Sequence, residues 1–233
     1  MHRVGAVFLC GGILHRTMKR RNGVILALDE VDPNKARSVA DAVVAHVDAI
    51  KINWPLILSA GPAMITELSK LGPVICDFKL ADIPNTNRLI TEQAVGRGAS
   101  GIIVQGFPGT DSVKAVVEAA AGAEVYVVTE MSHPGGREYT AAVADRIARM
   151  AVELKVTGVI APATRPGRIA EIRRIVGSLS ILSPGVGAQG GSAADAIRAG
   201  ADFVIVGRSI YGSPHPAEAA KEISEEVRSA LKK

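Results

Sequence analysis

The stretch VILALDE, residues Val24–Glu30, contains the pattern on which the fold prediction rests. Five apolar residues in a row predict a strand that is buried on both faces, as in a parallel sheet. The run ends in the acidic pair Asp29-Glu30, and no glycine-rich GxGxxG turn follows it. The missing turn argues against a dinucleotide-binding doubly wound sheet, whose first strand leads into such a turn.

The same unit, a short apolar run followed by a longer amphipathic stretch, recurs to the end of the chain. The eight predicted strands are Val24–Leu28, Ala49–Ile52, Val74–Phe78, Gly101–Val104, Val125–Val128, Gly158–Ile160, Ser180–Leu182 and Phe203–Val206. The eight predicted helices are Asn34–Val47, Pro62–Lys70, Thr86–Arg97, Ser112–Ala121, Thr140–Leu154, Pro166–Val176, Ala193–Ala199 and Pro216–Leu231. Alternating strands and helices predict a parallel sheet with helices packed against it.

Eight such units in a chain of 233 residues predict an α/β fold of the (β/α)8 TIM-barrel type. We expect one barrel domain over residues 1–233, with residues 1–23 as a leader before the first strand. The apolar run Val4–Leu14 in this leader is too short to span a membrane, and the basic residues after it do not fit a secretory signal. An upstream start codon, with Met18 as the true first residue, is the alternative explanation of the leader.

Composition narrows the class of function. The chain carries a net charge of +4, and aromatic residues make up 3% of it. Because the basic residues are spread out and base-stacking aromatics are few, we expect an anionic small molecule rather than nucleic acid as the partner. Cys10 and Cys76 lie far apart and give no disulfide framework, which favours a reducing cytoplasm. The five histidines lack the spacing of a structural zinc site.

Charged residues gather where the predicted strands end, and in a barrel this rim carries the active site. The densest group is DFKLAD, Asp77–Asp82, in which Asp77 and Lys79 are two apart on a strand and should point to the same face. Lys51, from the neighbouring strand, can contact this group, so that two lysines balance two aspartates. The alternative is an ion-pair network that only fixes strand register, but stabilising features belong at the opposite rim.

The ends of the last two strands predict a phosphate site. Glycines in the loop Gly185–Gly191 let backbone N–H groups approach an anion. Arg208, at the end of the eighth strand, can donate two hydrogen bonds to phosphate oxygens. Loops at these two positions commonly bind phosphate in barrels. The alternative is a flexible glycine loop beside a surface arginine.

A third loop, Met131–Gly136, follows the fifth predicted strand. Ser132 in this loop can both donate and accept hydrogen bonds, which suits an amide-like ring edge. Four further polar residues stay outside the predicted site, because each is equally well explained as a structural or surface residue: Asn53, Glu130, His133 and Arg165.

Together these segments resemble orotidine 5′-monophosphate decarboxylases, enzymes of pyrimidine nucleotide synthesis. The matching segments, in family order, are Leu28-Asp29, Lys51–Asn53, Asp77–Thr86, Met131–Gly135, Ser183–Gly191 and Val206–Tyr211. The D-x-K-x-x-D-I-P-x-T pattern and the PGVGAQ loop are highly specific in combination, and the compact length resembles the archaeal branch. Two features depart from the family: the leader before Val24, and Gln105 where the family has His.

The resemblance implies a cytoplasmic, homodimeric carboxy-lyase of de novo pyrimidine biosynthesis that needs no metal or other cofactor and binds neither nucleic acid nor membrane. Lys79 is implied to protonate pyrimidine C6 after CO2 leaves, beside Asp77 and Lys51, with Asp82 and Thr86 contributed across the dimer interface. The residues implied to bind substrate are Asp29, Lys51, Ile83, Thr86, Ser132, Pro184, Val186, Gln189, Gly207 and Arg208.

Three other functions share part of this pattern. A keto-sugar-phosphate decarboxylase or aldolase of the same superfamily would use Mg2+, held by an acidic residue where this chain has Lys51, whose charge repels the ion. A non-catalytic nucleotide-phosphate sensor should have lost part of the charge network, and none is lost here. A nucleic-acid-binding protein should show salt-sensitive binding.

Overall fold

The computed structural model describes residues 9–10, 13–14 and 18–232. Strands β3–β10 form one closed parallel barrel in the order β10-β3-β4-β5-β6-β7-β8-β9. Their bounds are β3 Val24–Leu28, β4 Ala49–Ile52, β5 Val74–Leu80, β6 Gly101–Gln105, β7 Glu124–Val128, β8 Gly158–Ile160, β9 Ser180–Pro184 and β10 Phe203–Val206. The predicted (β/α)8 barrel is confirmed.

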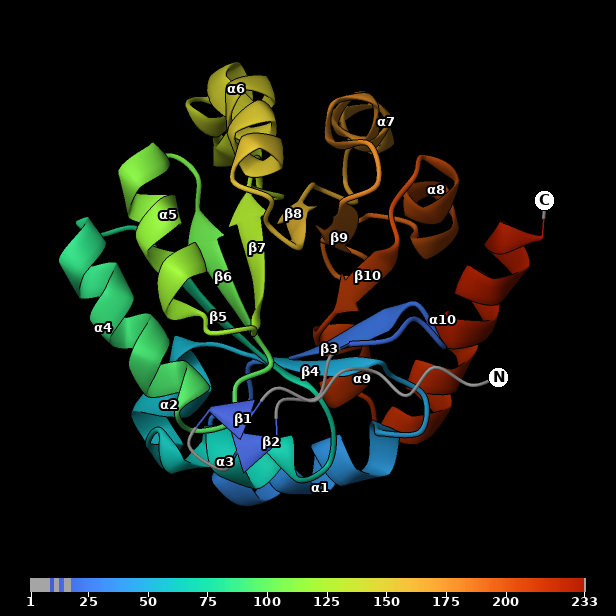
Figure 1. The fold of residues 1–233 in the computed structure, drawn as a ribbon. Coiled ribbons are helices and arrows are strands. Elements are labelled where there is room, and N and C mark those ends of the chain that lie inside the picture. The colour runs from blue at the N-terminus through green and yellow to red at the C-terminus, as the bar shows by residue number, and fades with distance from the viewer. Residues whose placement is uncertain (1–8, 11–12, 15–17, 233) are drawn as a thin grey trace, which may run out of the picture.

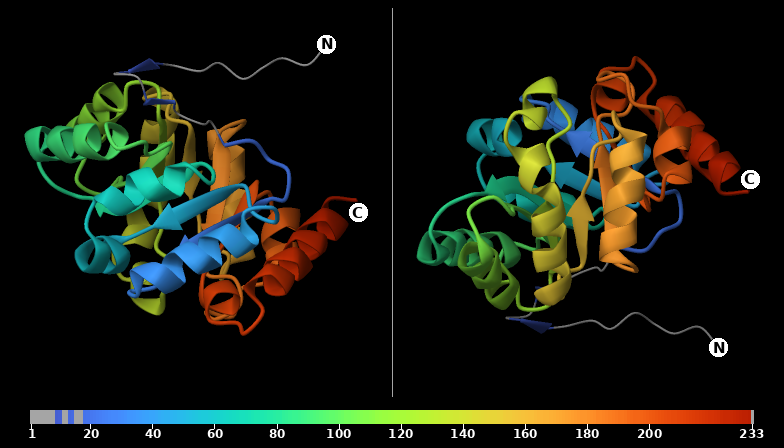
Figure 2. Two further views of the ribbon diagram at one scale, coloured as in Figure 1. Left: turned by 90° about the horizontal axis from the view of Figure 1, so that it is seen from below. Right: turned by 90° about the horizontal axis from the view of Figure 1, so that it is seen from above.

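Helices surround the barrel on its outside, as Figures 1 and 2 show. They are α1 Pro33–Val43, α2 Trp54–Ala60, α3 Ala63–Ser69, α4 Pro84–Val95, α5 Thr110–Ala119, α6 Thr140–Glu153, α7 Pro166–Val176, α8 Ala193–Arg198, α9 Arg208–Tyr211 and α10 Pro216–Leu231. The last helix, α10, packs beside α1, so the two ends of the chain close the ring of helices. Among the described residues, no helix is long and apolar enough to cross a membrane.

The predicted elements match the observed ones to within two residues at each end, with one exception. The first helix was expected to reach Val47 but ends at Val43, because the chain must turn there to enter β4 at Ala49. Three short helices were not predicted: α2, α9 and the 3-10 helix η1, Pro134–Arg137. The α2 helix starts where the Asn53 side chain accepts a hydrogen bond from the Trp54 N–H, an N-cap that the sequence analysis did not use.

The residues expected to form a leader are only partly described. Leu9–Cys10 (β1) and Ile13–Leu14 (β2) form a two-stranded antiparallel sheet. The other residues before Met18 lie outside the described residues. From Met18 onwards the chain is packed on the barrel, where Asp48 accepts hydrogen bonds from the N–H groups of Arg21, Asn22 and Gly23.

Alternation of side chains explains why the strands are apolar throughout. In β3, Ile25 and Ala27 belong to a cluster inside the barrel, whereas Val24, Leu26 and Leu28 pack against the helices outside it. Both faces are therefore buried, and all five residues of β3 are excluded from solvent. Aliphatic side chains fill most of both layers, as the low aromatic content requires.

A carboxyl group is buried at the N-terminal rim of the barrel, away from the strand ends that carry the predicted site. Glu124, at the start of β7, accepts hydrogen bonds from the Tyr126 hydroxyl and from the Met18 N–H, at 3.0 and 3.3 Å. Burial raises the pKa of Glu124 to about 7, although both hydrogen bonds oppose the shift.

The raised pKa of Glu124 predicts a pH-dependent stability. The folded state binds this proton more tightly than the unfolded state, so the stabilisation is complete below about pH 4.5 and is lost as the pH rises through about 7. A shift of this size corresponds to about 3 kcal/mol. The free energy of unfolding, measured with urea, should therefore change with pH differently in Glu124→Gln and in wild type. As the pH rises from about 4.5 to about 8.5, the stability of the variant relative to wild type should increase by about 3 kcal/mol. The control is Glu222→Gln, at an exposed position, which should show the same pH dependence of stability as wild type. If the stability difference between Glu124→Gln and wild type did not change with pH, the raised pKa of Glu124 would be refuted.

Candidate active site

A cavity of about 320 Å³ opens at the C-terminal ends of the barrel strands, within the size range of small-molecule sites. The predicted site residues that line it are Asp29, Lys51, Asp77, Lys79, Ser132, Pro184, Val186, Gln189, Gly207 and Arg208. They come from both halves of the chain, and the closed barrel brings them to one rim.

Four charged side chains form an alternating chain at the floor of this cavity. The Lys51 ammonium lies 2.9 Å from Asp77 Oδ2 and 3.9 Å from Asp29 Oδ1. The Lys79 ammonium lies 2.8 Å from Asp77 Oδ1 and 2.9 Å from Oδ2. Lys51 and Asp77 are buried, whereas Lys79 and Asp29 are about one-third exposed at their side chains. The solvent-accessible cation of the cluster is thus Lys79, and Lys51 is the buried one.

Mutual pairing keeps the two buried members of the cluster charged. Burial alone would raise the pKa of Asp77, but the two lysines outweigh it and hold that pKa below its usual range. Burial alone would lower the pKa of Lys51, but Asp77 and Asp29 outweigh it and the pKa is raised. Both groups are therefore ionised at neutral pH.

Lys79 reaches the cluster from a distorted part of β5. The pairing of β5 with β6 passes from Cys76–Ile102 to Leu80–Val104, so β5 carries two extra residues over this span. Lys79 has a φ of 44°, a left-handed conformation that costs a non-glycine residue about 1–3 kcal/mol. Asp77 and Lys79 point to the same site, as predicted from the sequence. The sequence suggested that regular strand alternation would bring them together, but in the structure their contact depends on this bulge.

Three predicted site residues lie outside the cavity: Asp82, Ile83 and Thr86. The Asp82 carboxylate accepts a hydrogen bond from the Ile83 N–H at 2.7 Å, and its backbone is held by Asn87. Asp82 and Ile83 are both exposed, Ile83 to 64%. Within one chain, therefore, Asp82 does not join the charge cluster.

The far end of the cavity has the features expected for an anion site. Arg208 begins α9 directly after Gly207, and Gln189 lies on the glycine-rich loop between β9 and α8. At Gly187, with a φ of 70°, a side chain would come within 2.3 Å of Ser209 Oγ, so this turn requires glycine. Among the ion pairs formed by residues 18–232, none involves Arg208, which leaves its guanidinium available to a ligand.

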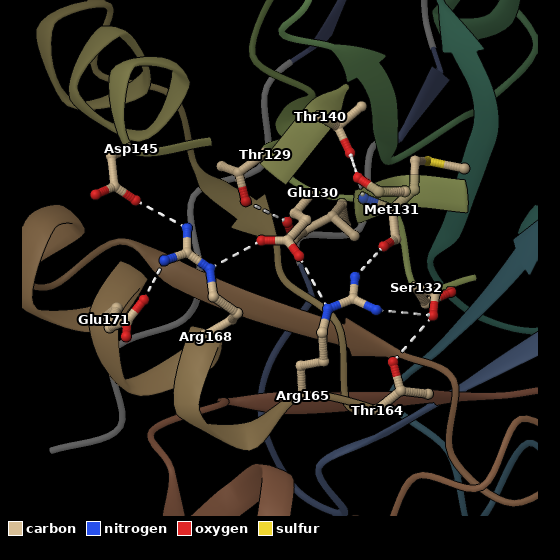
Figure 3. A network of polar contacts seen from close by, with 12 residues as sticks. Thr129, Glu130, Met131, Ser132, Thr140, Asp145, Thr164, Arg165, Arg168 and Glu171 are labelled. Carbon is tan, nitrogen blue, oxygen red and sulfur yellow. Dashed lines mark hydrogen bonds and ion pairs between the residues drawn. The ribbon is translucent and has the colours of Figure 1, made fainter. Parts of the chain in front are cut away.

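A polar network that the sequence analysis left out of the site supports the loop that carries Ser132 (Figure 3). The buried Glu130 carboxylate lies between Arg165 and Arg168, with each Nε 2.9 Å from one of its oxygens. Arg165 also donates to the carbonyls of Met131 and Ser132, and Thr164 donates to the Ser132 carbonyl at 2.9 Å. Asp145 and Glu171 hold Arg168 from the outside.

This network positions the Ser132 backbone through two helices, α6 and α7. Sequence spacing gave no signal for it, because the residues that pair with Glu130 lie 35 and 38 residues further along the chain. The polar, aromatic and sulfur-containing residues that line the cavity but were also left out are Asn53, Glu130, Met131, His133 and Tyr211. Gln105 is not among them, and its amide contacts Met131 Sδ instead.

Within the part of the chain that the structure describes, no three His, Cys, Asp or Glu side chains are placed to hold a metal ion. The end of β4, where an acidic ligand would be needed for Mg2+, carries the Lys51 ammonium in contact with Asp77. The site can therefore present two cations and two carboxylates to a substrate, with a hydrogen-bonding serine and an arginine further along the cavity.

Comparison with known proteins identifies relatives along almost the whole barrel. The model of the orotidine 5′-phosphate decarboxylase / HUMPS family matches residues 22–223. The chain is 58% identical over 213 residues to an orotidine 5′-phosphate decarboxylase of Methanococcoides burtonii, covering 90% of this chain and 99% of that protein. It is 56% identical over 218 residues to the Methanosarcina mazei protein of the same name, covering 92% and 99%.

Solved structures agree with the sequence comparison. The orotidine 5′-monophosphate decarboxylase of Methanocaldococcus jannaschii, complexed with the inhibitor BMP, superimposes with a TM-score of 0.84 at 44% identity and covers 91% of this chain and 99% of its own. The orotidine 5′-phosphate decarboxylase of Pyrococcus horikoshii gives a TM-score of 0.82 at 48% identity, covering 88% and 99%.

The buried pair predicts a large effect of Asp77→Asn on stability. The substitution leaves the Lys51 ammonium buried with only Asp29, 3.9 Å away. Breaking such a pair costs about 3–5 kcal/mol, which urea unfolding at neutral pH should detect. Because burial should then lower the pKa of Lys51, part of the loss should be recovered as the pH rises towards about 10.

The control is Asp195→Asn, which breaks an exposed pair with Arg198 and should cost less than about 1 kcal/mol. If Asp77→Asn were as stable as wild type at neutral pH, the cluster would not have the energetic role assigned to it.

Proposed function

The chain belongs to the orotidine 5′-phosphate decarboxylase / HUMPS family, and from this premise we propose that it is the carboxy-lyase that converts orotidine 5′-monophosphate to uridine 5′-monophosphate. The observation that carries the proposal is the Lys79 ammonium, which lies 2.8 Å from Asp77 at the open end of the charge cluster. A preorganised cation beside the reacting carbon is what this decarboxylation requires.

The reaction breaks the bond between pyrimidine C6 and the carboxylate carbon. CO2 leaves, and the electron pair stays on C6, where the ring has no adjacent electron sink. The Lys79 ammonium stabilises this pair and then donates its proton to C6, which yields the product and a neutral amine that solvent reprotonates. Lys51 remains ionised beside Asp77 and keeps the cluster balanced.

Asp77 acts on the leaving group. In the proposed pose the substrate carboxylate lies beside the Asp77 carboxylate, and two such anions about 4 Å apart repel by about 4 kcal/mol at an effective dielectric constant of about 20. The repulsion disappears when CO2 leaves. It promotes bond breaking only if other contacts hold the substrate in place, and the contacts to the distant phosphate supply that binding energy.

The other contacts follow from the position of each residue along the cavity. We place the ribose hydroxyls at Asp29 and Lys51, and the pyrimidine amide edge at Ser132. Pro184 and Val186 line the wall between the two ends, and the phosphate lies at Gln189, Gly207 and Arg208. The loop carrying Gln189 is proposed to close over the bound substrate.

The Mg2+-dependent keto-sugar-phosphate branch is the less favoured alternative. Its metal would need an acidic ligand at the end of β4, and the residue there is Lys51, ion-paired to Asp77 at 2.9 Å. The relatives described above are decarboxylases of the nucleotide by name, which supports the same choice.

A homodimer would explain the three predicted residues that lie outside the cavity. Asp82, Ile83 and Thr86 belong to the β5–α4 segment. Exposed apolar side chains lie on this segment and on those that follow β4 and β6: Trp54, Leu58, Ile83, Leu89 and Phe107. Trp54, Ile83 and Phe107 follow the neighbouring strands β4, β5 and β6, so they lie along one part of the rim. Such a patch favours a protein interface, and a two-fold contact could bring Asp82 and Thr86 into the partner's cavity.

We also propose that one catalytic domain accounts for the activity and that the protein works in the cytoplasm. The family match covers residues 22–223 and so includes all eight strands of the barrel. Cys76 is buried and free, and a free thiol is compatible with a reducing compartment.

The role of Lys79 predicts a specific loss of chemistry. Lys79→Ala should fold and bind the product with affinity similar to wild type, measured by calorimetry, but should lose turnover by about a thousandfold or more. The exposed Lys221→Ala is the matched control and should retain wild-type turnover. Substantial turnover by Lys79→Ala would overturn the assignment of the proton donor.

The shared site predicts complementation between two inactive variants. In a heterodimer of Lys79→Ala and Asp82→Ala, one cavity has both defects, and the other combines an intact Lys79 with an intact Asp82 from the partner. Random assortment should therefore restore roughly a quarter of the wild-type activity, whereas each variant alone stays inactive. If heterodimers form, as judged by co-purification of differently tagged chains, but stay inactive, Asp82 does not act across the interface.

A further inference from the structure

A second cavity, of about 490 Å³, adjoins the first. The residues lining both cavities are Ser132, His133, Gln189 and Arg208. The residues lining only the second are Pro134, Arg137, Thr164 and Arg165. The two cavities thus meet along these four residues, and the second extends to the η1 segment, which contains Pro134 and Arg137.

The wall of the second cavity carries positive charge without acidic residues. It includes three arginines, and neither Asp nor Glu lines it. Arg165 is already ion-paired with the buried Glu130. Arg137 and Arg208, by contrast, take part in none of the ion pairs formed by residues 18–232. Two guanidinium groups without acidic partners at one cavity favour a ligand with more than one anionic group.

We propose that the second cavity binds the terminal phosphate of a pyrimidine nucleoside 5′-diphosphate, which competes with the substrate and inhibits the enzyme. The inference rests on the proposed function, which places a 5′-phosphate at Gln189 and Arg208, two of the four residues that line both cavities. A phosphoryl group attached to that phosphate enters the second cavity, where Arg137 lines the wall. A nucleoside monophosphate carries no second phosphoryl group to place in this cavity.

The same geometry explains why the diphosphate inhibits. Gln189 belongs to the loop that is proposed to close over the substrate, and Gly185 at the start of this loop already lies close to Thr164 and Ser132. A phosphate in the second cavity occupies the space between this loop and the Ser132–Arg137 segment. The diphosphate therefore stabilises the open arrangement of the loop.

The test measures inhibition of orotidine 5′-monophosphate turnover by uridine 5′-monophosphate and by uridine 5′-diphosphate, in EDTA and at fixed ionic strength. The wild-type protein should bind the diphosphate about tenfold more tightly, the gain expected from one additional charge-assisted contact. Arg137→Ala should abolish this difference and change the inhibition constant of the monophosphate less than about twofold. The control Arg149→Ala removes an exposed arginine of α6 outside both cavities and should behave as wild type.

Equal inhibition by the two nucleotides in the wild type would overturn the proposal. The proposal would also be overturned if Arg137→Ala weakened inhibition by both nucleotides to the same extent. Arg137 would then contribute to the overall electrostatic potential of the site and would not contact the second phosphate. A wild-type protein that does not turn over orotidine 5′-monophosphate would contradict the proposed function instead. In that case, calorimetry with the same two nucleotides still decides whether the second cavity binds a diphosphate.

Discussion

The pairing of Asp77 with Lys51 is the interaction on which the site depends. Neither group could remain charged alone at this depth, and each keeps the other ionised. With Asp77 fixed as an anion, Lys79, which is about one-third exposed, is held at the cavity floor although its backbone adopts a left-handed conformation. The strain at Lys79 is thus offset by an ion pair, and contacts within the protein alone hold the proposed proton donor in position.

The barrel separates reactive from stabilising features. The C-terminal rim carries the charge cluster, the glycine-rich loop and the Glu130 network that supports Ser132. At the opposite rim, Glu124 and Asp48 hold the chain entering the first barrel strand. Helices α6 and α7 connect the scaffold to the site, because Asp145 and Glu171 hold Arg168, which in turn holds Glu130 (Figure 3). Loop variation can therefore alter one rim without affecting the packing at the other.

The sequence alone predicted the barrel, since long apolar strands such as Val24–Leu28 have to be buried on both faces. It also predicted most of the cavity, because polar residues at strand ends meet at one rim. Local geometry was harder to predict from the sequence. Regular strand alternation gave no sign of the bulge before Lys79. Helix α1 ends four residues before the end of its amphipathic pattern. Contacts between distant segments, such as that of Arg165 with Glu130, can be seen only in the fold.

The central claim is that the charge cluster decarboxylates the nucleotide without a metal. Its most direct test is to add orotidine 5′-monophosphate to the purified, EDTA-treated protein and follow the loss of ultraviolet absorbance. Conversion should be rapid, and added Mg2+ should not accelerate it. No conversion, with activity on a keto-sugar phosphate only after Mg2+ is restored, would contradict it and would mean that the role of Lys51 had been misread.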